Sequence, residues 1–206
     1  MVSRRLGIEL TDTDRNYVDD YLRRSVAALE AVAADPQFRN TIETIAGVIA
    51  KAVGGTGKLL LAGNGGSAAD AQHLAAEFLS RFVSDRRPLP AIALTTDTSV
   101  LTAIGNDYGF DQVFERQVRG LGQPDDVFVA ISTSGRSRNV LAALRAAREV
   151  KVVTIGFTGK NPGEMAALCD YCLCAPSDET AIIQQIHIVA GHAICGLAEQ
   201  AIARNS

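Results

Sequence analysis

The chain has 206 residues, of which 47% are hydrophobic and 21% charged, a balance typical of one globular domain with a sizeable core. Lys and Arg number 20 against 23 Asp and Glu, so the net charge is −3, and no basic block is present. We therefore expect no nucleic-acid binding through a basic patch. The N-terminal segment, Met1 to Asp14, carries Arg4 and Arg5 but lacks the apolar run of a signal peptide. No uninterrupted apolar run in the sequence approaches the roughly 18 residues of a membrane span. These features predict a cytoplasmic protein without a membrane segment.

Two helical patterns open the chain. Apolar residues recur at helical spacing over residues 14–34, before Asp35-Pro36, and again over residues 37–53, before Gly54-Gly55. They predict an N-terminal helical arm, residues 1–55, whose amphipathic faces need a partner surface such as another subunit.

Short apolar runs then alternate with helical patterns over residues 56–206. The expected strands are 59–62, 91–94, 127–131, 152–157 and 171–174. The expected helices are 68–81, 99–105, 110–121, 137–150 and 179–203. This order predicts an α/β fold, a five-stranded parallel sheet flanked by helices on both faces, that forms one structural unit with the arm.

The first strand–helix junction is rich in glycine: Ala62-Gly-Asn-Gly-Gly-Ser-Ala-Ala-Asp-Ala-Gln-His. Glycines allow close approach of the backbone, and we expect Ser67 to cap a helix whose free N–H groups attract an anion. The segment also matches G-x-G-x-x-A, so a dinucleotide site is an alternative. The acidic residue that such a site needs about 20 positions later is not there.

The second junction, Ile131-Ser-Thr-Ser-Gly-Arg-Ser, places four hydroxyl groups at a predicted helix N-terminus. Hydroxyl and backbone N–H donors suit a phosphate monoester, while a Ser/Thr-rich helix cap without a ligand is the alternative. Two such loops in one small sheet favour a phosphate site.

These two blocks resemble the sugar isomerase (SIS) domain and, more narrowly, the phosphoheptose isomerases. The resemblance extends to the arm, to Gly105-Asn-Asp-Tyr-Gly-Phe-Asp and to Gln184-x-x-His-x4-His. It implies substrate contacts at the following positions: Asn64, Gly65, Gly66, Asn106, Asp107, Ser132, Thr133, Ser134, Ser137 and Gln184. From the residues alone, Asn106-Asp107 also fits a turn before Gly109.

Histidine and carboxylate spacing adds a possible metal site. His73 and Glu77 are four residues apart and share a helix face, while Gln184 and His192 lie about 80° apart around the last helix. Spacing alone leaves a surface pair as the alternative. The resemblance implies one zinc ion per subunit bound by His73, Glu77, Gln184 and His192, with Glu77 and His192 as the acid–base pair. His187 has no such role, and we interpret it as a structural histidine.

The four cysteines, at positions 169, 172, 174 and 195, include a single C-x-x-C. A zinc site of thiolates alone would need all of them. Alternation along the last strand places Cys172 and Cys174 on one face. We interpret the cysteines as small residues in a reducing compartment.

The last helix departs from the family pattern, because Ile182 replaces the usual arginine and Gln185 the usual glutamate. Pro88-Leu-Pro-Ala-Ile-Ala-Leu and Ser99-Val-Leu-Thr-Ala-Ile also resemble the initiator-associating proteins, so a non-catalytic SIS-domain binding protein of that type is the alternative function. Those relatives lack the complete acid–base and metal set, whereas this chain keeps Glu77 and His192. A sugar-phosphate-sensing regulator would need an attached DNA-binding domain.

The resemblance implies isomerisation of sedoheptulose 7-phosphate to D-glycero-D-manno-heptose 7-phosphate, through an enediol, for the heptose precursors of lipopolysaccharide. It also implies a homotetramer with shared active sites. Neither glycine loop specifies the sugar's carbon number.

Overall fold

The computed structural model describes residues 11–204, and its centre is one parallel sheet. The strand order is β2-β1-β3-β4-β5, and every neighbouring pair is parallel. The strands are β1 (Leu59–Gly63), β2 (Ala91–Ala93), β3 (Val127–Ile131), β4 (Val153–Thr158) and β5 (Tyr171–Cys174). All residues of β1 and β3 are buried, as expected for central strands covered on both faces. The expected α/β fold is confirmed.

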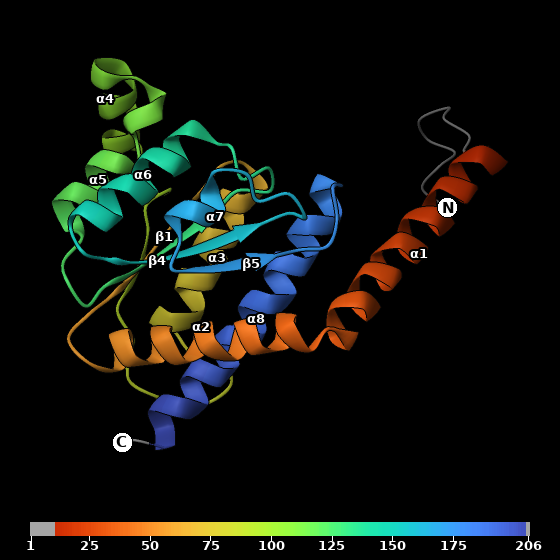
Figure 1. Cartoon of the computed structure of the whole chain (residues 1–206), viewed down its shortest axis with the longest axis horizontal. Coiled ribbons are helices and arrows are strands. Elements are labelled where there is room, and N and C mark those ends of the chain that lie inside the picture. Colours follow the sequence, from red (N-terminus) through yellow and green to blue (C-terminus); the bar gives the residue numbers. More distant parts are fainter. Residues whose placement is uncertain (1–10, 205–206) are drawn as a thin grey trace, which may run out of the picture.

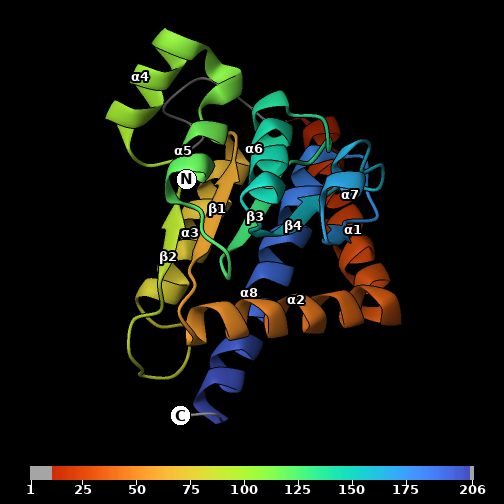
Figure 2. The same ribbon diagram turned by 60° about the vertical axis from the view of Figure 1, so that its left-hand side comes forward.

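Helices cover both faces of this sheet (Figure 1), and a separate apolar core lies between the sheet and the helices on each face. One face carries α2 (Pro36–Gly54), α3 (Gly66–Leu79) and α8 (Thr180–Arg204). The other carries α5 (Glu115–Leu121), α6 (Arg138–Glu149) and the short α7 (Met165–Leu168). Figure 2 shows α4 (Thr98–Tyr108) standing beyond α5 at one end of the molecule.

The two N-terminal helices differ in their burial. The first, α1 (Asp12–Ala34), begins with a capping box in which Thr11 and Asp14 bond each other's backbone N–H groups, and it buries only Val32. The second, α2, begins at Pro36 after the Asp35 cap and buries seven residues against the sheet and α8. Thus α2 belongs to the core, while α1 projects from it (Figure 1).

The last helix, α8, is long and apolar enough to cross a membrane by length and composition. Half of its most apolar stretch is buried inside the protein. Contacts with α2, α3 and β4 account for this apolar character, because a core helix surrounded by other elements has little polar face.

The expected helix over residues 110–121 is wrong. A 3-10 turn, Phe110–Gln112, is followed by a break and then by α5. The consecutive residues Val113 and Phe114 are both buried on the α6 face, and the chain turns there to bury them. The turn of α7, only four residues long, was too short for its periodicity to predict.

Candidate functional site

The two predicted loops lie side by side because of the strand order. In a 2-1-3-4-5 sheet the connections leave β1 and β3 in opposite directions, which opens a crevice at the carboxyl ends of these strands. Their register pairs Gly63 with Ile131, so Asn64 and Ser132 leave the sheet next to each other. Loops separated by almost 70 residues in the sequence therefore form one site.

The glycine loop adopts the tight turn that its composition suggested. Gly65 has φ of 56°, a left-handed conformation that glycine adopts without strain, and it is the N-cap of α3. The expectation that Ser67 caps this helix is wrong: Ser67 lies inside the first turn and is buried. Within the described chain, the backbone N–H groups of Gly65 and Gly66 donate to no protein atom. They are available to an anion at the helix N-terminus.

The Ser/Thr loop has the same character. The side-chain oxygens of Ser132 and Ser137 are 3.0 Å apart, and Ser137 is the N-cap residue of α6. Gly135 has φ of 63°, and a Cβ there would lie 2.1 Å from the carbonyl oxygen of Pro162, so only glycine fits. Thr133 and Ser134 line an adjoining cavity of about 210 Å³. The arrangement is that of a compact oxyanion cradle.

Asn139 joins the two loops, and sequence reasoning missed it. Its side-chain amide and that of Asn64 exchange two hydrogen bonds, each 2.9 Å long. Asn139 is only 3% exposed, although it lies in the first turn of α6. A polar residue buried at the start of a helix was the available signal, but burial was not visible from the sequence.

Sequence reasoning also missed the cations of the cavity beside the Ser/Thr loop. The side chains of Arg136 and Lys160 line this cavity together with Thr133, Ser134 and Thr180. They supply positive charge next to the hydroxyl groups, as a phosphate requires.

His73, Glu77 and His192 converge as expected. The Nε2 atoms of the two histidines are 2.8 Å apart, and Nε2 of His73 lies 3.3 Å from Oε1 of Glu77. One ligand atom from each residue falls within 4.8 Å of the others. The predicted shared face of His73 and Glu77 is confirmed, and α8 brings in His192 from 119 residues away.

This donor set fits a catalytic zinc site. Two imidazoles and one carboxylate are ligand types that zinc binds in proteins, and a tetrahedral zinc ion would accept a fourth ligand beside them.

Gln184 is the fourth residue of the predicted metal site. Its amide packs against Gly66, where a Cβ would meet Nε2 at 2.4 Å. Gln184 therefore touches the glycine loop, in agreement with a substrate contact, and its role as a metal ligand stays a prediction.

Asp70 is a carboxylate of α3 that the sequence did not single out. It lies one turn before His73, and its Oδ2 atom is buried without a hydrogen-bond partner in the described chain. Burial raises the pKa of this carboxyl, and the nearby His73 partly offsets that effect.

The role of Asn106 and Asp107 as substrate contacts stays a prediction. They lie in the last turns of α4, not in a turn before Gly109, and both are exposed. The amide of Asn106 bonds the carboxylate of Asp107 at 2.8 Å, so this pair is partnered with itself.

His187 is buried at 1% exposure, and its Nε2 atom bonds the carbonyl oxygen of Thr158 at 3.0 Å. Its Nδ1 atom is buried and has no partner in the described chain, so the structural histidine is bonded at one nitrogen only. Burial lowers its pKa to about 4, and the ring is neutral at pH 7.

The cysteines do not form a four-thiolate site. Cys172 and Cys174 share a strand face as predicted, with their sulfurs 3.8 Å apart, and both are partly exposed. Cys195 belongs to the core on the opposite face of the sheet from Cys169. Hydrogen bonding from the Cys172 thiol lowers the pKa of Cys174 to about 7.

The two departures from the family pattern have structural roles. Ile182 is 2% exposed and lies in the core. The amide of Gln185 donates to the hydroxyl of Tyr21 at 2.8 Å and ties α8 to α1.

Comparison with known proteins first defines the class. Residues 20–159 match the SIS domain family, which covers β1 to β4 and both loops of the site. The chain therefore belongs to the SIS domain proteins.

Its relatives narrow the class further. The chain is 55% identical to the phosphoheptose isomerase of Bradyrhizobium over 96% of its own length and all of the relative's. It is 50% identical to that of Aneurinibacillus thermoaerophilus over 92% of its length and 96% of the relative's. Within the SIS domain proteins, the chain belongs to the phosphoheptose isomerase family, and it is an enzyme of the isomerase class.

Solved structures agree with this assignment. The phosphoheptose isomerase of Francisella tularensis superposes with a TM-score of 0.86 at 37% identity, over 93% of this chain and all of that one. That of Neisseria gonorrhoeae superposes with a TM-score of 0.83 at 43% identity, over 90% of this chain and 98% of that one.

Proposed function

We propose that the protein converts sedoheptulose 7-phosphate into D-glycero-D-manno-heptose 7-phosphate, through an enediol, in the cytoplasm and for the heptose precursors of lipopolysaccharide. The convergence of His73, Glu77 and His192 carries this proposal. It supplies an acid–base pair, with Glu77 on the helix that the glycine loop opens, in a chain of the phosphoheptose isomerase family.

The phosphate binds to the Ser/Thr loop. Hydroxyl groups of Ser132, Thr133, Ser134 and Ser137 donate to its oxygens, together with backbone N–H groups at the start of α6. Asn64, Gly65 and Gly66 hold the sugar backbone from the neighbouring loop, and the bond between Asn64 and Asn139 keeps the loops in register. We also propose Asn106 and Asp107, near the end of α4, as substrate contacts.

Glu77 moves the carbon-bound proton between C1 and C2. Its Oε1 atom faces His73, which leaves Oε2 for the substrate. His192 exchanges protons with the oxygens on C1 and C2, because an imidazole can both donate and accept a proton.

His73, Glu77, His192 and Gln184 would hold one zinc ion. When bound, zinc polarises the substrate carbonyl and stabilises the negative charge that develops on oxygen. Glu77 would then serve as both ligand and base through its two oxygens.

The arm points to an oligomer. Tyr17, Val18, Leu22 and Val26 are each more than half exposed, at 66%, 53%, 56% and 54%, on a helix that buries one residue in its own chain. Such a stripe supports a homotetramer whose subunits share active sites. We also propose that residues 1–55 and 56–206 form one structural unit, because α2 contributes to the core of the sheet.

Turnover of sedoheptulose 7-phosphate by purified protein tests the proposal. We expect chelation to abolish turnover and added zinc to restore it. With metal restored, Glu77→Gln and His192→Ala should each lower kcat by at least about 100-fold, because acid–base catalysis contributes about 10² to 10⁴.

Glu115→Gln is the matched control, since Glu115 also forms an i,i+4 ion pair, with Arg119, but on α5. It should turn over as the wild type does. Near wild-type kcat in metal-loaded Glu77→Gln would contradict the role of Glu77. Absence of turnover by folded, metal-loaded wild type would contradict the assignment of sedoheptulose 7-phosphate as the substrate.

A further inference from the structure

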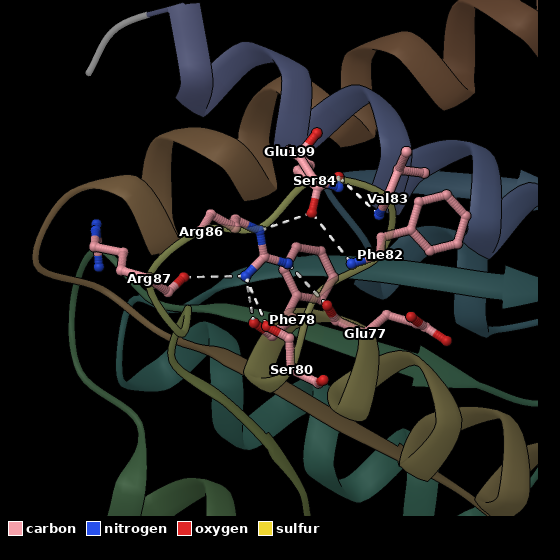
Figure 3. A network of polar contacts seen from close by, with 9 residues as sticks. All are labelled: Glu77, Phe78, Ser80, Phe82, Val83, Ser84, Arg86, Arg87 and Glu199. Atoms are coloured by element: carbon pink, nitrogen blue, oxygen red, sulfur yellow. Dashed lines mark hydrogen bonds and ion pairs between the residues drawn. The ribbon is translucent and has the colours of Figure 1, made fainter.

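The loop that follows α3 is held by one buried carboxylate of α8 (Figure 3). Glu199 is 4% exposed and accepts hydrogen bonds from the backbone N–H groups of Phe82, Val83 and Ser84, at 3.1, 3.0 and 2.9 Å. Its fourth donor is Nε of Arg86, at 2.9 Å. Burial alone would raise the pKa of Glu199, but these bonds and the Arg86 charge lower it below its usual value.

Arg86 caps the C-terminus of α3 from the other side. The last carbonyl groups of a helix lack partners inside the helix and need donors from elsewhere. Nη2 of Arg86 donates to the carbonyl oxygen of Glu77 at 2.8 Å, and Nη1 donates to that of Phe78 at 2.9 Å. The Arg86 side chain is 12% exposed, so little water competes for these bonds.

The hydrogen bonds of Arg86 and Glu199, here called the network, involve both members of the proposed acid–base pair or their direct neighbours. Glu77 lies in the last turn of α3, the turn that Arg86 closes. Phe82, whose N–H bonds Glu199, places its ring against that of His192, with centroids 5.6 Å apart. His192 and Glu199 are on the same helix, so the ion pair connects both members of the acid–base pair to one rigid element.

We propose that Arg86 and Glu199 are positioning residues for catalysis, which hold the last turn of α3 and the ring of Phe82 so that Glu77 and His192 face the substrate. The inference rests on the proposed roles of Glu77 and His192. Arg86 and Glu199 touch no reacting atom and act through the backbone of Glu77 and the side chain of Phe82.

Kinetics of charge-removing variants test the inference. We expect Glu199→Gln to lower kcat by about 10- to 100-fold, because a misplacement of about 1 Å costs up to about 100-fold. KM should change less than about threefold, since the phosphate and glycine loops lie outside the network. Arg86→Lys keeps the charge but cannot reach Glu199 and the α3 carbonyls together, so an intermediate kcat is expected.

Asp126 provides the matched control for loss of a buried ion pair. It is 2% exposed, accepts a bond from Nζ of Lys58 and accepts backbone N–H bonds from Lys58 and Gln123, at the amino ends of β1 and β3. Asp126→Asn should lower Tm as Glu199→Gln does and leave kcat unchanged. Equal losses of kcat in the two variants would overturn the inference.

The double variant Arg86→Met/Glu199→Met distinguishes a loss of kcat through mispositioned catalytic residues from a loss of kcat through lower stability of the fold. Removing both charges avoids an unpaired buried ion and should recover most of the lost Tm. We expect kcat to stay low, because the carbonyl groups of α3 remain uncapped. Recovery of kcat together with Tm would overturn the inference.

Glu77→Gln is assayed alongside these variants. If it is inactive while the double variant retains wild-type kcat, only the positioning role fails. If it retains turnover, the proposed acid–base role fails instead.

Discussion

His187 illustrates how burial changes the chemistry of a single residue. His73 and His192 face each other between α3 and α8, whereas His187 faces Phe157 and the Thr158 carbonyl inside the core. Because its folded pKa is about 4, the folded protein does not protonate it at pH 5. The unfolded chain does, since an unperturbed histidine has a pKa of about 6.5.

Stability should therefore fall as the pH drops from about 6.5 towards 4, because only the unfolded state gains a proton in that window. At pH 5 the His187 contribution to this loss is roughly 2 kcal/mol relative to pH 7. In His187→Gln, which retains a donor for the Thr158 carbonyl, the difference in unfolding free energy between pH 7 and pH 5 should be smaller by about that amount.

Urea unfolding at the two pH values measures this difference. The carboxylates titrate alike in both proteins, so subtracting the variant from the wild type isolates His187. Identical pH dependence in wild type and variant would contradict the neutral, buried state.

At the level of elements, the contact between β1 and α3 depends on glycine. A Cβ on Gly63 would lie 2.7 Å from the backbone oxygen of Ser67 and 2.8 Å from its Cβ. The first turn of α3 can therefore approach the strand end closely, which places the N–H groups of the glycine loop at the sheet edge.

Gly63→Ala should cost about 1–3 kcal/mol of unfolding free energy, because the backbone must shift to relieve the overlap. Gly105→Ala is the control: nothing lies within 4 Å of a Cβ there, inside α4. Removing glycine flexibility from a helix should stabilise by about 0.5–1 kcal/mol. Chemical denaturation of both variants checks the two signs, and equal effects would contradict the close approach.

At the level of the whole molecule, α1 is attached to the body by few polar contacts. Arg24 pairs with Glu179 at 3.2 Å, and Tyr21 accepts the bond from Gln185. These contacts leave the apolar stripe of α1 exposed in the single chain. We propose that a second copy of the chain covers this stripe.

Leu22→Asp/Val26→Asp should dissociate the proposed tetramer, because charges in an apolar interface lose hydration without gaining partners. Light scattering after size exclusion measures the mass. Leu121→Asp, at an apolar residue that is 41% exposed on α5, should leave the mass unchanged. A wild-type mass of 21.8 kDa, that of one chain, would contradict the tetramer.

The sequence alone was sufficient for the fold class, the two loops and the pairing of His73 with Glu77. Each depends on a local pattern. Apolar strands alternate with amphipathic helices, and glycine and hydroxyl residues lie at the strand–helix junctions. A spacing of four residues places two side chains on one helix face. Such patterns are decided within about one or two turns of backbone, so no distant contact is needed to recognise them.

Only the tertiary structure decided which distant residues meet. Strand order brought Asn64 to Asn139, and packing of α8 on α3 brought His192 to Glu77 and Glu199 to Arg86. It also assigned Ser67 to the interior and Asn106 to an exposed helix, against expectation. The reason is physical: burial and long-range hydrogen bonding depend on how the elements pack, and the spacing of residues along one element does not encode the position of another.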